Sequence, residues 1–266
     1  MSRVRGDRDM AFPHDPPMSH GSGPNADRVL VIGGLIVRGM GVASYDLALS
    51  GHLARKLAAF TGRGADIETR GVDGFDSHHA EAVLRSEDLT RFDAVLIMLG
   101  IKEVMSLRPL RMWRVDIRQL LEVLHELAPA KMPSLMVGVA PFAMPMGVPK
   151  FVVRWVDRAA DLMNAETERA CAASGAAEYV PFHPELVGIR PGANAGAIYS
   201  TWATALVPFL ARALASQVPP TQPENESDWS PGHEDARQLA LDDLGVVDGA
   251  PDARVGRIVE MARDML

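Results

Sequence analysis

The chain lacks several features that would by themselves define a function class. It has a single cysteine, Cys171, in 266 residues, so an intrachain disulfide framework is excluded. A reducing, cytoplasmic setting is then the default. Because Cys171 lies between two alanines in a helical pattern, we expect it to be a small core residue. No run of eighteen apolar residues occurs, and we therefore expect no transmembrane helix and no membrane partner.

A surplus of positive charge is also absent. Lys and Arg number 27 against 34 Asp and Glu, which gives a formal net charge of −7. Residues 216–266 contain 11 acidic and 4 basic residues. This tail therefore carries the whole net charge, and residues 1–215 are formally neutral. A neutral body has no excess cations to neutralise phosphates, and we therefore expect no nucleic-acid partner.

Apolar runs of strand length alternate with amphipathic segments of helix length. The expected strands are Arg28–Ile32, Asp66–Arg70, Ala94–Met98, Ser134–Ala140 and Glu178–Phe182, and the expected helices are about Ser44–Phe60, His79–Arg85, Arg111–Leu127, Phe151–Ala173 and Ala195–Ala215. Several strands are apolar on both faces, which is typical of a parallel sheet covered by helices on both sides. The sequence therefore predicts a three-layer α/β fold over residues 28–215, with ligands at the carboxyl ends of the strands.

The flanking segments differ from this domain in composition. Residues 1–27 are rich in Pro, Gly, His and charge and have no apolar segment typical of a signal peptide, which predicts a disordered leader. The Pro-, Ser- and acid-rich residues 216–231 predict a linker. Residues 232–266 contain two helical patterns, which are too short to form an independent core and predict a helical C-terminal extension.

The most informative motif follows the first expected strand. Residues 28–39 are RVLVIGGLIVRG, in which Gly33 and Gly39 frame five other residues. This segment resembles the first block of the SGNH (GDSL) hydrolases, where a buried strand leads into Gly-Asp-Ser-x-x-x-Gly and the serine is the nucleophile. The resemblance implies a flavodoxin-like, SGNH hydrolase-type fold. Gly34 and Leu35 occupy the Asp and Ser positions, and a leucine side chain has no oxygen to attack a carbonyl.

The second and third family blocks keep their glycines. Gly74, within the segment GVDGF of residues 71–75, matches the family glycine whose backbone N–H donates to the oxyanion. In the third block, Gly-x-Asn-Asp in the family, Gly100 is retained while Lys102 and Glu103 replace Asn and Asp. We expect Lys102 and Glu103 to form a solvated pair.

The last family block, Asp-x-x-His-Pro, is altered at both catalytic positions. Val187 and Arg190 stand where the resemblance places the acid and the base. The Tyr199 and Trp202 that follow resemble the family's "GY…WA" helix. His183-Pro184 is an alternative His-Pro, but it falls seven residues early and has no serine partner at Leu35.

These replacements predict that esterase activity is lost. Removal of a nucleophilic serine costs a factor of roughly 10⁶ in rate, and loss of an oxyanion amide costs about 10²–10³, for which the cation of Lys102 would substitute in part. Arg190 stays protonated and cannot accept a proton. The expected function is a binding, regulatory or scaffold module. The alternatives are an active esterase with a relocated site, at a serine such as Ser44, Ser77 or Ser106, and a truncated product of a fusion protein.

The side chains at the expected sheet edge suggest a small ligand. Lys102 and Arg190 would together form an anion site at the strand ends, with Gly34, Leu35 and Gly74 as further candidate ligand-binding residues. The apolar loop of residues 141–149 would suit an acyl or aromatic group. The possible ligand is therefore a small acyl or anionic compound.

Cofactor and metal motifs are incomplete. After Gly34 the chain completes neither a phosphate-binding loop nor a dinucleotide fingerprint, so no cofactor is expected. His78 and His79 are adjacent and have no evident third ligand, so no metal is expected.

The C-terminal segment resembles the opening of a bacterial GAF sensor domain. The matching stretches are HEDARQLAL at 233–241, LGVVDGAP at 244–251 and RIVEMA at 257–262. The resemblance implies a sensor or signalling partner for this region, and a chain that ends early in the GAF pattern. An ordinary acidic helical tail is the alternative.

Overall fold

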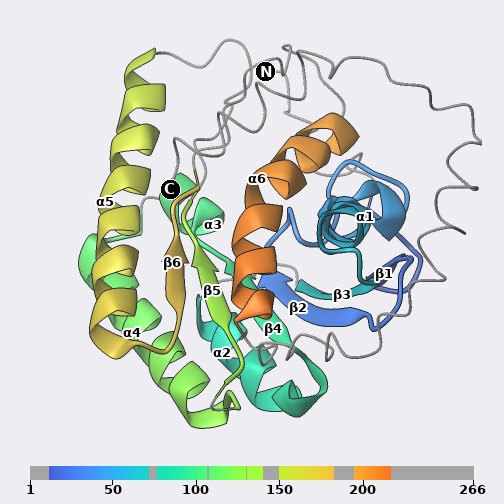
Figure 1. Cartoon of the computed structure of the whole chain (residues 1–266). Coiled ribbons are helices and arrows are strands. Elements are labelled where there is room, and N and C mark those ends of the chain that lie inside the picture. The colour runs from blue at the N-terminus through green and yellow to red at the C-terminus, as the bar shows by residue number, and fades with distance from the viewer. Residues whose placement is uncertain are drawn as a thin grey trace, which may run out of the picture. The chain divides into compact units, whose positions relative to one another are not determined.

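The computed structural model describes residues 12–71, 77–106, 108–129, 131–139, 150–182 and 195–216. These residues form a six-stranded mixed sheet with the strand order β1-β3-β2-β4-β5-β6 (Figure 1). The strands are β1 Met18–Gly21, β2 Asp27–Gly33, β3 Ala65–Gly71, β4 Ala94–Met98, β5 Ser134–Val137 and β6 Glu178–Val180. Strands β2 to β6 pair in parallel, and β1 pairs antiparallel to β3. The parallel part has the flavodoxin-like order 2-1-3-4-5, which confirms the predicted fold class.

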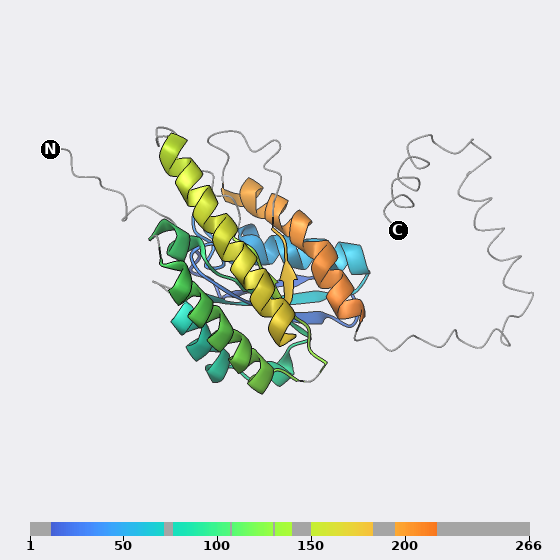
Figure 2. The ribbon, with the colours of Figure 1, turned by 90° about the vertical axis from the view of Figure 1, so that its left-hand side faces the viewer.

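Helices cover both faces of the sheet. They are α1 Leu49–Thr61, α2 Ser77–Ser86, α3 Ile101–Met105, α4 Leu110–Leu127, α5 Lys150–Ser174 and α6 Ala195–Ala215, with short 3₁₀ helices at Tyr45–Leu47 and Leu89–Arg91. Helices α1 and α6 lie together on one face, called here the α1/α6 side, and α2, α4 and α5 lie on the other, the α4/α5 side (Figures 1 and 2). All five predicted helices are present; α3 was not predicted.

The core is divided between these two sides. On β2, Val29 and Val31 pack into the cluster on the α1/α6 side, and Leu30 and Ile32 pack into the cluster on the α4/α5 side. Each of these four side chains is at most 1% exposed. Because alternate side chains of a strand point to opposite faces, burial on both faces explains why the sequence of β2 is an uninterrupted apolar run.

Residues Met18–Gly21 form the edge strand β1, which is antiparallel to β3. The prediction of a disordered leader is therefore wrong for these residues, and the prediction of a wholly parallel sheet is wrong as well. The inward residues of β1 are Ser19 and Gly21, not apolar ones. The Ser19 hydroxyl donates to Ser50 Oγ on α1 at 3.0 Å. A Cβ on Gly21 would lie 2.2 Å from the carbonyl oxygen of Ala54. Besides its pairing with β3, this strand is held by close backbone approach and a side-chain hydrogen bond, which a search for apolar alternation does not detect.

Other predictions fall on residues that the structure does not describe. The linker over 216–231, apart from its first residue, and the helices of 232–266 lie outside the described residues and stay predictions. No helix in the described part combines the length and apolar character needed to cross a bilayer.

Candidate functional site at the carboxyl edge of the sheet

The carboxyl edge between β2 and β4 is where the strand order reverses. The chain passes from β2 to β3 on one side, and then from β3 to β4 on the other. Gly33 at the end of β2 is paired with Met98 at the end of β4. Ligands of open α/β sheets bind outside the strands at such a reversal, so the segments that follow β2 and β4 form the candidate site.

The turn after β2 (residues 34–42, the β2 turn) requires its framing glycines for backbone reasons. A Cβ on Gly33 would lie 2.6 Å from the carbonyl oxygen of Met98. Gly39 has a φ of 76°, which L side chains rarely adopt. The turn is closed by hydrogen bonds from Arg38 N to Gly34 O at 3.2 Å and from Met40 N to Leu35 O at 3.1 Å. The glycine frame is therefore needed for the fold, whatever the chemistry of the residues between.

Leu35 is exposed at this edge. It is the residue that the family resemblance places at the nucleophile position, and its side chain is 44% accessible to solvent. A Cβ on the neighbouring Gly34 would have no heavy atom within 4 Å. An exposed aliphatic group next to open space offers a surface for binding and no atom for nucleophilic attack.

Lys102 and Glu103 lie in the first turn of the short helix α3, which follows β4. Gly100, with a φ of 104°, is its N-cap. Lys102 is exposed, whereas Glu103 is only 3% exposed. The expectation of a solvated pair is therefore wrong for Glu103, because the turn of α3 directs the two consecutive side chains in different directions. Lys102 is placed to present a cation at the carboxyl edge of β4.

The β2 turn is braced by residues from distant parts of the chain. The Tyr199 hydroxyl on α6 donates to the carbonyl oxygen of Met40 at 2.7 Å, and burial raises the pKa of this phenol. The Arg38 guanidinium lies 4.5 Å from the centre of the Phe12 ring. Asp15 accepts a hydrogen bond from the backbone N–H of Tyr45. The sequence pattern identified Tyr199, but Phe12 and Asp15 were missed because they fall in the segment predicted to be disordered.

Three predicted site residues lie outside the described residues. Gly74, Val187 and Arg190 stay predictions, as does the apolar loop of residues 141–149. The structure therefore brings Gly34, Leu35 and Lys102 to one edge of the sheet and does not test the other half of the predicted anion site.

Two described residues that could act as nucleophiles, Ser106 and Cys171, are not activated. Ser106 donates to the backbone oxygen of Glu103 at 3.2 Å, and no described serine hydroxyl is hydrogen-bonded to His14, His20, His52 or His125. The side chain of Ser77 is outside the described part. Cys171 is buried, as predicted, and burial raises its pKa to about 11, so the thiol is protonated at neutral pH.

Metal ligands are likewise not gathered. Within the ranges that the structure describes, no group of three or more His, Cys, Asp and Glu side chains is arranged to hold a metal ion.

The strand order and the helices on both faces define a three-layer, flavodoxin-like α/β domain. No family model matches the sequence, and no curated protein matches it. Similar solved structures include TesA, which is 17% identical in sequence, and Est24, a carbohydrate acetylesterase from Sinorhizobium meliloti, which is 16% identical. Each of these two comparisons covers 70% of this chain and 99% of the other chain, at a TM-score of 0.52. The aryl esterase of M. smegmatis is 16% identical, over 71% of this chain and 100% of its own, also at 0.52. At such identities the likeness establishes the fold alone.

Proposed function

We propose that this chain is a degenerate member of the SGNH hydrolase superfamily that has lost esterase activity and acts as a binding, regulatory or scaffold module. The observation that carries the proposal is Leu35, an exposed aliphatic side chain at the end of β2, where the family resemblance requires a serine hydroxyl. Without an attacking oxygen no acyl-enzyme can form. The β2 turn nevertheless keeps the backbone geometry on which a ligand would rest.

The proposed ligand is a small acyl or anionic compound. Gly34 leaves open space, Leu35 presents apolar surface, and Lys102 supplies an exposed cation at the neighbouring strand end. Gly74 and Arg190 are further residues that the sequence proposes for this site. Since a single cysteine favours a reducing compartment, we place this function in the cytoplasm, with a sensor or signalling partner for the GAF-like C-terminal region.

The proposal is tested by hydrolysis of p-nitrophenyl acetate and butyrate. The wild-type chain should not exceed the uncatalysed blank. Leu35→Ser should add little, because Lys102 and Arg190 stand where the oxyanion amide and the base belong. Leu162→Ser, which changes another exposed leucine, is the matched control. Wild-type turnover that disappears when the protein is unfolded would reject the proposal.

The alternative is an active acyl hydrolase with a relocated site. It is favoured by the names of similar structures, two of which are esterases. It predicts covalent labelling of Ser44, Ser77 or Ser106 by a fluorophosphonate probe, followed by peptide mass analysis. Absence of labelling on the folded chain would exclude this alternative.

A further inference from the structure

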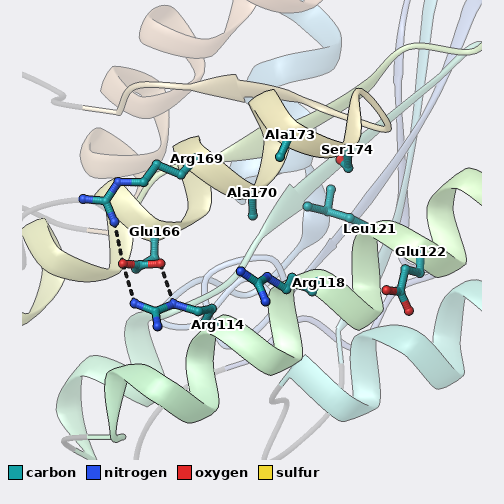
Figure 3. Close-up of a pocket in the computed structure, with 9 residues that line it drawn as sticks. All are labelled: Arg114, Arg118, Leu121, Glu122, Glu166, Arg169, Ala170, Ala173 and Ser174. Atoms are coloured by element: carbon teal, nitrogen blue, oxygen red, sulfur yellow. Dashed lines mark hydrogen bonds and ion pairs between the residues drawn. The ribbon is translucent and has the colours of Figure 1, made fainter.

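A second hollow lies on the outer surface of the helices on the α4/α5 side, away from the residues of the candidate site. This α4/α5 groove has a volume of ≈ 590 Å³ (Figure 3), which falls in the usual range for small-molecule sites. It is lined by Arg114, Arg118, Leu121, Glu122, Glu166, Arg169, Ala170, Ala173 and Ser174.

The groove exists because large side chains give way to small ones along the helix pair. Near its start, α4 packs Trp113 against α5, and the indole Nε1 donates to the carbonyl oxygen of Met163 at 3.2 Å and to Thr167 Oγ1 at 3.1 Å. About two turns further along, the facing residues of α5 are Ala170 and Ala173, which cannot fill the same space. Leu121 of α4 is only 1% exposed and closes the floor of the groove beneath these alanines.

One end of the groove is organised by a carboxylate between two guanidinium groups. Arg114 donates to Glu166 through Nε and Nη2, both at 2.8 Å, and Arg169 donates to the same carboxylate at 2.5 Å. These hydrogen bonds and charges hold the pKa of Glu166 below its usual range. Glu166 is therefore ionised at neutral pH, and Arg114 and Arg169 are fixed in place by it.

Arg118 is the cation of the groove that this carboxylate does not engage. It extends from α4 into the space between the two helices (Figure 3). Within the described part of the chain it makes no ion pair or hydrogen bond. Three arginines and two glutamates give the lining a formal charge of +1.

We propose that the α4/α5 groove binds a short-chain organic carboxylate, with its carboxylate on Arg118 and its alkyl chain on Ala170 and Ala173. The planar guanidinium fork matches a carboxylate with two parallel hydrogen bonds. A monoanion neutralises the excess charge of the lining, whereas a phosphate dianion would leave net negative charge beside Glu122 and Glu166. Ala170 and Ala173 are about one helical turn apart, roughly 5 Å along the axis, which is the length of a short alkyl chain.

The test is calorimetric titration of the full chain with hexanoate, with hexanamide and inorganic phosphate as probes that lack the charge or the alkyl chain. We expect saturable binding of hexanoate only. Arg118→Gln should weaken it by at least about tenfold, the scale of one charge-assisted hydrogen bond. Arg111→Gln, an exposed arginine on the same helix outside the groove, should change nothing. Ala173→Leu, at an exposed position, should also weaken hexanoate binding by filling the apolar part.

Four outcomes would overturn this proposal: no saturable binding, tighter binding of phosphate than of hexanoate, equal binding of hexanamide, or equal effects of Arg118→Gln and Arg111→Gln. A Lys102→Gln variant separates the two sites. If it abolishes hexanoate binding while Arg118→Gln leaves it unchanged, the ligand lies at the carboxyl edge, which supports the proposed function and rejects the groove.

Discussion

The two sides of the sheet reach the same degree of burial with different chemistry. On the α1/α6 side, the core cluster is aliphatic and aromatic from α1 to α6, and the buried hydroxyls of Ser19 and Ser50 bond to each other at the sheet edge. On the α4/α5 side, α4 and α5 bury Asn164, Thr167 and Asp116 among the apolar residues. The core between α1 and α6 is therefore almost wholly apolar, whereas the core between α4 and α5 includes several buried polar side chains.

The polar contacts of the α4/α5 side fix the ends of strands. Asn164 on α5 accepts a hydrogen bond from the backbone N–H of Val139 at 2.7 Å and donates to its carbonyl oxygen at 3.0 Å. Asp116 on α4 pairs with Arg108 at 2.5 Å, next to α3. Because buried polar groups are costly unless they are hydrogen-bonded, the two hydrogen bonds of Asn164 favour the observed position of the segment after β5. At the carboxyl edge, the segment after β5 is therefore held from the α4/α5 side, whereas the β2 turn is held from the α1/α6 side by Tyr199.

The largest loss in the free energy of unfolding is expected for Asn164→Leu. The substitution keeps a similar side-chain size and leaves the N–H and C=O of Val139 without partners. At about 1–3 kcal/mol for each orphaned buried group, the free energy of unfolding should fall by about 2–6 kcal/mol in urea titrations. Asp161→Asn, exposed on the same helix, should stay within about 0.5 kcal/mol of wild type. If Asn164→Leu were as stable as wild type, the hydrogen bonds of Asn164 would contribute nothing to the free energy of unfolding.

On the α1/α6 side, a slightly smaller loss in the free energy of unfolding is expected for Leu53→Ala. Leu53 on α1 is fully buried, and its truncation should lower the free energy of unfolding by about 2–5 kcal/mol through lost burial and a cavity. Leu53→Met, which nearly conserves volume, should cost less than about 1.5 kcal/mol. If Leu53→Met were as damaging as Leu53→Ala in the same urea titration, the α1/α6 side would depend on more than volume.

The smallest loss of stability is expected when the surface ion pair of Arg114 and Glu166 is removed. The hydrogen bond from Arg114 lowers the pKa of Glu166 below its ordinary value of 4.5 in the folded state. The pair therefore stabilises the fold above about pH 4.5, and this contribution is lost as pH falls through the lowered folded-state pKa. Arg114→Gln should reduce the urea midpoint at pH 7 by less than either core variant, and the difference should vanish in strong acid. A difference that persists there would exclude this electrostatic origin, and Arg111→Gln is the control.

The sequence predicted the parallel strands and the helices that pack on them because long apolar periodicity reports burial directly. Val29 to Ile32 are a clear example, since both faces of β2 are buried. It did not predict β1, whose inward residues are Ser19 and Gly21, or α3, a single short turn after Gly100. Elements held by close backbone approach or by one hydrogen bond leave no periodic signal.

For the candidate site, the family resemblance predicted that Leu35 and Lys102 follow two neighbouring strands. Both residues lie at the carboxyl edge, Leu35 after β2 and Lys102 after β4. The burial of Glu103 could not be predicted, because it depends on the direction of one turn of helix. The brace of Phe12 on Arg38 joins residues far apart in sequence and has no local pattern. The α4/α5 groove was missed for a similar reason. The alanines of α5 predict a helix, but the sequence does not show which residues of α4 face them.

The hydrogen bond from Tyr199 to Met40 spans 159 residues. During synthesis, the β2 turn emerges from the ribosome long before the helix that holds it, and contacts of such separation form late. A nascent chain stopped before α6 would thus carry the β2 turn without its hydroxyl tether.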